Sequence, residues 1–68
     1  MTVSFEYNDK IIANADLSVV PSVTERVMIW DKDYYVIHKR HEVEIKQKAS
    51  GKKSVTEKII CQVMALDD

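Results

Sequence analysis

The sequence predicts an all-β fold: a single small curled antiparallel sheet or barrel of four to five strands. Apolar residues recur at every second position over most of the chain, as in strands with one buried face. Short polar segments rich in turn-forming residues separate these stretches. With 68 residues the chain has room for one modest core, so we expect a single domain spanning residues 1–68.

The first two strands are predicted on either side of an Asx turn. In residues 2–7 apolar and polar side chains alternate strictly. The Asn-Asp-Lys segment at residues 8–10 supplies turn chemistry, because short Asx side chains tolerate left-handed backbone. A second, less regular strand resumes at Ile11. Residues 16–21 are expected to form an extended connection, since Pro21 lacks a backbone N–H for a ladder.

A hairpin is predicted in the middle of the chain. Residues 26–30 alternate as a strand, and the polar segment 31–33 is expected to turn before the next strand begins. That strand is expected to be long, because the alternation continues through residues 34–47. Its apolar character lapses at Lys39 and His41, which indicates a bulge, a bend or an exit from the core.

Two patterns compete in the last segment, residues 54–66. Residues 49–53, which hold the only glycine, are predicted to form the hairpin loop before it. A capping box at residues 54–57, with apolar residues near one helical face, allows a C-terminal helix and an α+β fold. The many β-branched residues favour a strand instead, because such side chains lose freedom in a helix.

The pairing of the last two strands is predicted from charge. If Val43 faces Ile59, then Glu44 faces Lys58, so that opposite charges pair on the outer face. A neighbouring register would set Val43 against Glu57. We therefore expect the first register.

Charge is unevenly distributed although the net charge is −1. Residues 1–37 carry a net charge of −3, whereas residues 38–58 carry a net charge of +4. A basic hairpin on a weakly acidic body could face phosphates, an acidic protein surface or water.

Few residues suit catalysis or metal binding. Cys61 is the only cysteine, so neither an intramolecular disulfide nor a Cys/His zinc quartet can form. His38 and His41 would point to opposite faces of a strand, where they cannot share a metal. The predicted register sets Cys61 beside His41, but a lone cysteine in a strand is typically a small core residue. We predict no enzyme activity, no cofactor and no metal site.

The chain also lacks sequence signals for export or membrane insertion. Residues 1–10 contain no basic stretch followed by an apolar run, and no segment approaches the ~18 apolar residues that span a membrane. Together with the unpaired thiol, this predicts a cytoplasmic protein with no membrane partner.

One stretch resembles a known pattern. Residues 20–29, Val-Pro-Ser-Val-Thr-Glu-Arg-Val-Met-Ile, followed by Tyr-Val-Ile-His at residues 35–38, resemble short proteins of phage and mobile-element genomes. Those share a Val-Pro-x-Val-Gly-Asp/Glu-x-Val-x-Ile stretch that leads through a turn to Tyr-x-Val and a nearby His. The resemblance implies a small barrel similar to the Src-homology-3 type, with no general activity. Thr24 stands where that pattern has its turn glycine.

Binding is the predicted function. A short β chain can pair a partner with its sheet edge, and exposed apolar side chains are natural anchors. We predict a non-catalytic protein-binding or assembly module, phage or mobile-element encoded by resemblance, whose partner is another protein or a second copy in a homo-oligomer. The predicted contact residues are Met28, Trp30 and Tyr34.

Nucleic-acid binding is the alternative function. Basic residues of the hairpin 38–58 could contact phosphates while Trp30, Tyr34 or Tyr35 stack on bases. The net charge of −1 and the isoelectric point near 6.1 fall short of the basic footprint expected for such a domain, so a protein partner is favoured. The residues that would contact phosphates are Lys39, Arg40, Lys46, Lys48, Lys52 and Lys53.

Overall fold

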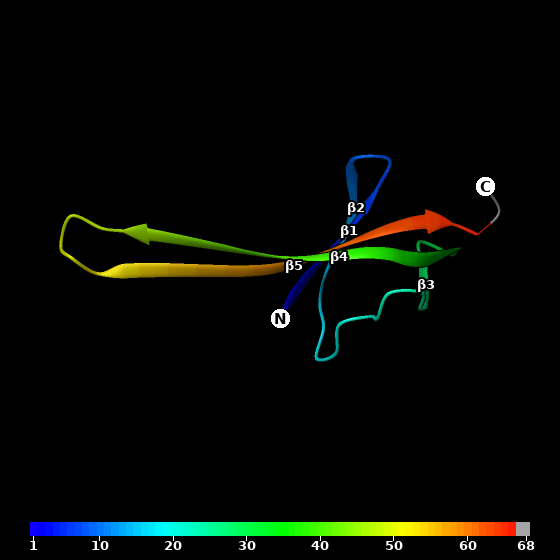
Figure 1. Cartoon of the computed structure of the whole chain (residues 1–68), viewed down its shortest axis with the longest axis horizontal. Coiled ribbons are helices and arrows are strands. Elements are labelled where there is room, and N and C mark those ends of the chain that lie inside the picture. The colour runs from blue at the N-terminus through cyan, green and yellow to red at the C-terminus, as the bar shows by residue number, and fades with distance from the viewer. Residues whose placement is uncertain (67–68) are drawn as a thin grey trace.

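Five strands form one mixed sheet that curls into a nearly closed barrel, from which a long hairpin projects (Figure 1). This computed structural model describes residues 1–66, and none of them is helical. The all-β prediction is therefore confirmed, and the alternative of a helix from residue 54 is wrong. The strands are β1 (Thr2–Tyr7), β2 (Lys10–Asp16), β3 (Arg26–Ile29), β4 (Lys32–Gln47) and β5 (Lys53–Ala65), in the sheet order β2-β1-β5-β4-β3.

Strands β1 and β5 contribute most of the buried core. They run parallel, with Val3 opposite Ile59 and Phe5 opposite Cys61. The other strand pairs are antiparallel, so the sheet is mixed and not the purely antiparallel sheet that the sequence predicted. Parallel strands need a long connection, and three intervening strands supply it here. The core side chains are Val3, Phe5, Ile29, Tyr34, Val36, Cys61, Val63 and Ala65.

Two tight turns join neighbouring antiparallel strands through left-handed backbone. Asn8 (φ 51°) and Asp9 (φ 64°) connect β1 to β2, as predicted. Trp30 (φ 52°) and Asp31 (φ 64°) connect β3 to β4 in the same way. The predicted turn at residues 31–33 is therefore misplaced, because a two-residue turn of this kind matches the twist of the strands and draws Trp30 out of β3.

Strand β4 leaves the core at a β-bulge. The register between β4 and β5 shifts between Val36 and His38, which leaves Ile37 as an extra residue. The lapse at Lys39 and His41 predicted an irregularity, and the structure places it two residues before Lys39. Beyond the bulge the β4 side chains are mostly exposed.

The pairing of β4 with β5 differs from the predicted register. Val43 lies opposite Glu57 and not Ile59. Core contacts and the bulge fix the pairing of β4 with β5 near the barrel. The continuous hydrogen-bonded ladder keeps the same register along the hairpin, so the register does not depend on the charges there. The observed register nevertheless pairs opposite charges, because Glu42 lies opposite Lys58.

Strands β4 and β5 continue beyond the barrel as a two-stranded arm, residues 42–58; we call the other described residues the body. Within β5, only residues 59–62 pair with β1, so the pairing with β1 ends where the arm begins. The molecule measures 51 Å along its longest axis and 23 and 18 Å along the others. A loop at residues 48–52, one residue earlier than the predicted loop at residues 49–53, closes the arm, and Gly51 within it has φ 84°.

A turn before β3 holds Thr24 in a conformation that favours glycine. The Glu25 amide donates to the Ser22 carbonyl oxygen at 3.0 Å, and Thr24 has φ 76°. This geometry is that of the third position of a type II turn, where positive φ strains a β-branched residue. The pattern that this stretch resembles has its glycine at the same position.

We predict that Thr24→Gly raises the free energy of unfolding by about 0.5–1 kcal/mol, because relief of the left-handed strain outweighs the greater chain entropy of glycine. Val23→Gly is the matched control, since it adds the same entropy one residue earlier, where φ is not positive; it should lower stability. Urea unfolding of both variants measures the difference. Equal destabilisation by the two substitutions would contradict a strained turn.

Candidate functional site

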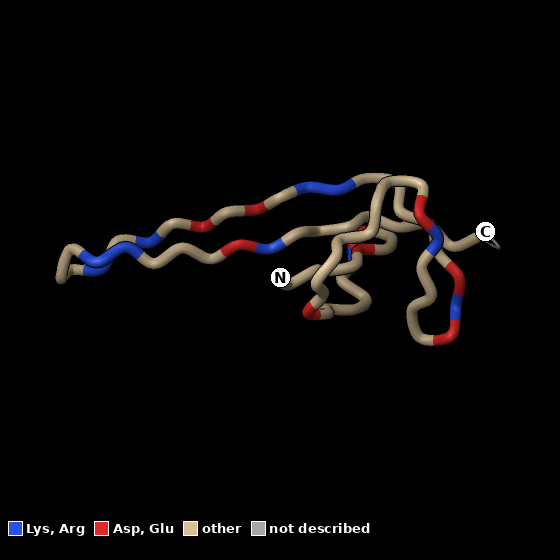
Figure 2. Tube along the Cα trace, turned by 90° about the horizontal axis from the view of Figure 1, so that it is seen from below, with Lys and Arg blue, Asp and Glu red and all other residues tan. Residues whose placement is uncertain are grey.

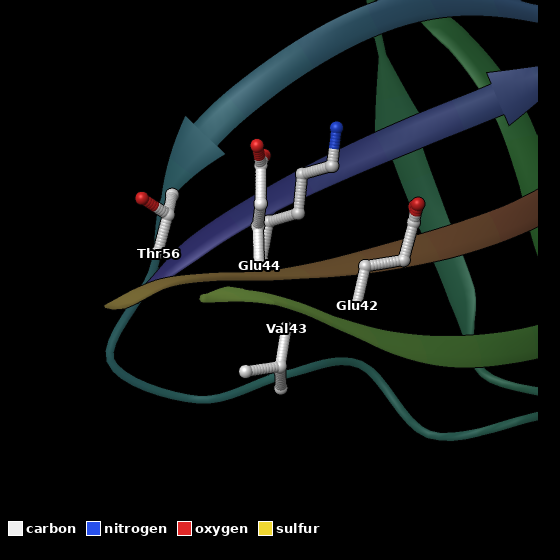
Figure 3. Close-up of a pocket in the computed structure, with 5 residues that line it drawn as sticks. Glu42, Val43, Glu44 and Thr56 are labelled. Atoms are coloured by element: carbon white, nitrogen blue, oxygen red, sulfur yellow. The ribbon is translucent and has the colours of Figure 1, made fainter. Parts of the chain in front are cut away.

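One face of the arm carries three apolar side chains beside Glu57, and the other face is polar. Residues opposite one another in an antiparallel pair share a face, which places Val43, Ile45 and Val55 together. Their side chains are 51%, 65% and 61% exposed, respectively. Figure 3 shows Val43 on the side of the hairpin opposite to Glu42 and Glu44. We call the three apolar residues the apolar strip.

The polar face of the arm carries charges that neutralise one another. Lys46 Nζ lies 3.2 Å from Glu44 Oε1, and Arg40 Nε lies 3.9 Å from Glu42 Oε2. Arg40 Nη2 also lies 3.2 Å from Glu6 Oε2 of the body. Exposed pairs of this kind contribute little stability but suit contact with water. This face is therefore compatible with exposure to water.

Polar residues bound the apolar strip at both ends. At the body end His41 Nε2 donates to Glu57 Oε1 at 2.8 Å, and Glu57 lies directly opposite Val43, so its carboxylate lies beside the strip. At the tip Gln47 lies opposite Lys53. The strip is therefore a short apolar patch in the middle of the arm.

The arm has little core of its own. Within residues 1–66, β4 and β5 pair only with each other along the arm, and an isolated two-stranded hairpin is marginally stable in water. Full burial of a valine or isoleucine side chain stabilises by about 1.5–3 kcal/mol. Covering the half-exposed strip would thus contribute roughly 1 kcal/mol per residue. The arm is suited to gain stability from a partner.

Sequence reasoning did not select the strip as a contact surface. The available signal was the return of alternating apolar residues on both sides of the loop 48–52, after the lapse at Lys39 and His41. The same alternation is equally typical of a strand that faces the core. In the structure no core lies beside these side chains, because the pairing of β1 with β5 stops at residue 59.

A second apolar surface lies at the seam where the barrel does not fully close. Strands β2 and β3 are the two edges of the sheet, and Trp30 Nε1 bridges them by donating to the Ile12 carbonyl oxygen at 2.9 Å. Met28 and Trp30 are 70% and 77% exposed. A groove of about 350 Å³ runs along this seam, and we call it the seam groove. Its lining includes Ala13, Ala15, Leu17, Met28, Ile29 and Trp30.

Met28 and Trp30, two of the three predicted contact residues, line this groove, but Tyr34 does not. Tyr34 is buried, and its ring packs edge-to-face on Tyr7 with the centroids 5.5 Å apart. The two-residue turn sets Tyr34 opposite Val27, whose side chain packs against the core. Tyr34 is therefore a core residue, which the misplaced turn concealed.

The predicted phosphate-binding residues fall into two groups. Lys39 and Arg40 lie at the base of the arm, where Arg40 is held by Glu6 and Glu42. The others surround the tip, and no acidic residue interrupts residues 46–53 (Figure 2). These tip lysines are Lys46, Lys48, Lys52 and Lys53.

The aromatic residues proposed for base stacking lie far from the tip lysines. Trp30 is in the turn between β3 and β4, which lies toward the opposite end of the long axis from the tip (Figure 1). Tyr34 is in the core, and Tyr35, half-buried, pairs with Met64 in the body. The predicted combination of lysines with stacking rings is therefore not assembled.

Other chemistry finds little support among residues 1–66. No group of three His, Cys, Asp or Glu side chains there could hold a metal ion. Cys61 is buried opposite Lys39, so the predicted neighbour His41 lies two residues further along β4, opposite Ile59. Burial raises the pKa of the Cys61 thiol, which disfavours the reactive thiolate. No helix in this part of the chain is long and apolar enough to cross a membrane.

Burial of Cys61 predicts a pH dependence of stability. The folded-state pKa of the thiol is raised above its ordinary value of 9.0. The contribution of the neutral, buried thiol to the free energy of unfolding is therefore complete below pH 9.0 and is lost as the pH rises through the folded-state pKa. Cys61→Ala removes this titration, so its free energy of unfolding should fall less steeply over that range than that of the wild type. Urea unfolding at successive pH values measures both slopes, and parallel slopes would refute the prediction.

No family model, no curated protein and no solved structure matches the chain, so comparison with known proteins assigns no role to these surfaces. The resemblance to short proteins of phage and mobile-element genomes stays a prediction.

Proposed function

We propose that this chain is a non-catalytic protein-assembly module that docks on a protein partner through the apolar strip of its arm. One observation carries the proposal: Val43, Ile45 and Val55 are exposed on one face of an arm that extends past the core. Met28 and Trp30 at the seam groove offer a second exposed apolar surface.

The asymmetry of the arm supports a protein partner. On one face of the arm, Glu42 and Glu44 keep the hairpin in contact with water. Its other face presents three β-branched apolar side chains, with the charged Glu57 opposite Val43. Side chains of this kind fit complementary apolar surfaces of proteins, whereas phosphates select lysine and arginine.

The turn at Trp30 supports the seam groove as a contact surface. Trp30 has positive φ, a conformation that costs about 1–3 kcal/mol in a residue other than glycine. Asparagine or glycine would suit the turn better. The bulky residue found there is mostly exposed, and tryptophan is enriched at the centres of protein interfaces.

Photo-cross-linking in the native cell tests docking through the strip. We predict that a photoreactive phenylalanine analogue at Ile45 forms covalent adducts with a protein, because this position faces the partner. The same analogue at Glu44, the next residue on the polar face, is the matched control and should form few adducts. Gel mobility of the tagged chain measures both yields. No protein adduct from position 45, or equal yields from the two positions, would count against the proposal.

Nucleic-acid binding is a second candidate, favoured by the four tip lysines. A two-stranded ribbon fits the major groove of duplex DNA, and no carboxylate in residues 46–53 would repel phosphates. The net charge of −1 and the distance between the tip and the exposed Trp30 disfavour this candidate.

Salt titration of DNA binding decides the second candidate. If the tip contacts phosphates, replacing Lys48 and Lys52 together by Gln should reduce the slope of log affinity against log salt by about 2. Replacing Lys10 and Lys32 of the body by Gln is the matched control and should leave the slope unchanged. Fluorescence anisotropy with a labelled duplex measures each slope. A wild type that does not bind at low salt would eliminate nucleic acid as a partner.

A further inference from the structure

We infer that two copies of this chain pair the free edges of their β5 arm segments antiparallel, with Val55 of one copy opposite Val55 of the other. This contact uses the edge of the arm, so it goes beyond the proposed function and leaves the apolar strip free for another partner. Along the arm, no described strand pairs with β5 on the side that faces away from β4 (Figure 1). An open strand edge of this kind is a template for pairing with another chain.

The hairpin ladder determines which backbone groups of β5 face outward. The Lys48 amide donates to the Lys52 carbonyl oxygen at 2.8 Å, so these two residues form a hydrogen-bonded pair. Hydrogen-bonded and non-hydrogen-bonded pairs alternate along an antiparallel ladder, and this ladder is regular through residues 53–58. Lys53, Val55 and Glu57 therefore occupy non-hydrogen-bonded pairs, and their N–H and C=O groups point away from β4.

Pairing two copies about Val55 satisfies these outward groups and two charges at once. It sets Lys53 of each copy opposite Glu57 of the other, and all three pairs exchange backbone hydrogen bonds. Lys53 makes no ion pair within the described part of a single chain. Glu57 accepts from His41 through Oε1, and a carboxylate can accept further hydrogen bonds through its second oxygen. The β5 edge is thus complementary to itself.

The same register aligns the other side chains of the arm. Residues opposite one another share a face, so Ile45 and Val55 of the two copies form one row of four apolar side chains. On the opposite face, Ser54 lies across from Thr56 of the second copy, and cross-strand hydroxyl pairs of this kind can hydrogen-bond.

Other registers of this edge fit less well. A shift by two residues sets Lys53 opposite Val55, or Val55 opposite Glu57, so that a charge meets an apolar side chain. A shift by one residue sets outward backbone groups against inward ones. In the register about Val55, the like charges that meet at the margin are Lys52 and Lys58, and Lys58 lies opposite a glutamate of its own chain.

The β4 edge of the arm offers a weaker match. Self-pairing there about Ile45 would set Val43 opposite Gln47 of the second copy. The carboxylates of Glu42 and Glu44 already lie 3.9 and 3.2 Å from cationic groups of their own chain. Ion pairs formed at this edge would therefore replace pairs that the single chain already has.

The two bodies do not compete for space in this dimer. The paired β5 strands run in opposite directions, so each body lies beyond the tip of the other arm. Strand β1 begins its pairing at residue 59 of β5, whereas the second copy covers residues 53–57. Both neighbours therefore fit along one edge, and the isologous contact closes as a dimer.

Charge exchange between residues 53 and 57, both exposed, tests the register. Lys53→Glu and Glu57→Lys each set like charges opposite one another and should raise the dissociation constant of the dimer by about tenfold or more. The double variant, and an equimolar mixture of the two single variants, restore opposite charges and should regain dimers close to wild-type strength. The matched controls Lys48→Glu and Glu44→Lys make the same charge changes away from the β5 edge. Sedimentation equilibrium measures each dissociation constant.

Methylation of single amide nitrogens in the synthetic chain distinguishes edge pairing from packing of two strips. N-methylation at Val55 removes an outward N–H that the hairpin does not use, so it should abolish the dimer. N-methylation at Ile45, an outward amide of the β4 edge, is the matched control and should leave the dimer intact.

The inference is overturned by a wild type that is monomeric at every concentration, by a dimer that survives both single charge changes, or by losses that neither the double variant nor the mixture restores. Dimerisation that is lost on methylation at Ile45 and kept on methylation at Val55 would overturn it in favour of the β4 edge. The proposed function is judged separately, because adducts from position 45 with a different protein would leave it standing whatever the mass of the wild type.

Discussion

The pairing of a short β1 with a long β5 is the constraint on which the rest of the structure depends. Strand β1 has six residues and β5 has thirteen, and the part of β5 that lies beside β1 is residues 59–62. One half of β5 is therefore drawn into the core, while residues 53–58 pair only with β4 among the described strands. The arm exists because the core ends before β4 and β5 do.

This division separates the source of stability from the surface available for binding. Buried side chains such as Val3, Val36 and Val63 hold the body together, and the arm outside it has few buried contacts. Segments of that kind open more readily than a packed core, and a partner can supply the missing stabilisation. The strained residues Thr24 and Trp30 both lie in turns of the body, where packed strands can hold an unfavourable backbone in place.

The two apolar surfaces differ in shape, position and charge. The strip lies on a projecting ribbon with a basic tip, and the seam groove lies between strands β2 and β3 of the body. The chain therefore presents one projecting and one recessed apolar surface at different places on the molecule.

Preferences of adjacent residues alone determined several parts of this protein. The turn at Asn8 and Asp9 and the left-handed loop position of Gly51 follow from local side-chain chemistry, and the β-branched residues favoured the strand β5 over the helix that the capping box allowed. Only the tertiary structure decided the parallel contact of β1 with β5, the register of the arm and the burial of Tyr34. These depend on which distant segments pack together, and one residue more or less in a turn or bulge moves every following side chain to the opposite face. The apolar alternation of the arm was therefore visible in the sequence, whereas its exposure depended on where the body ends.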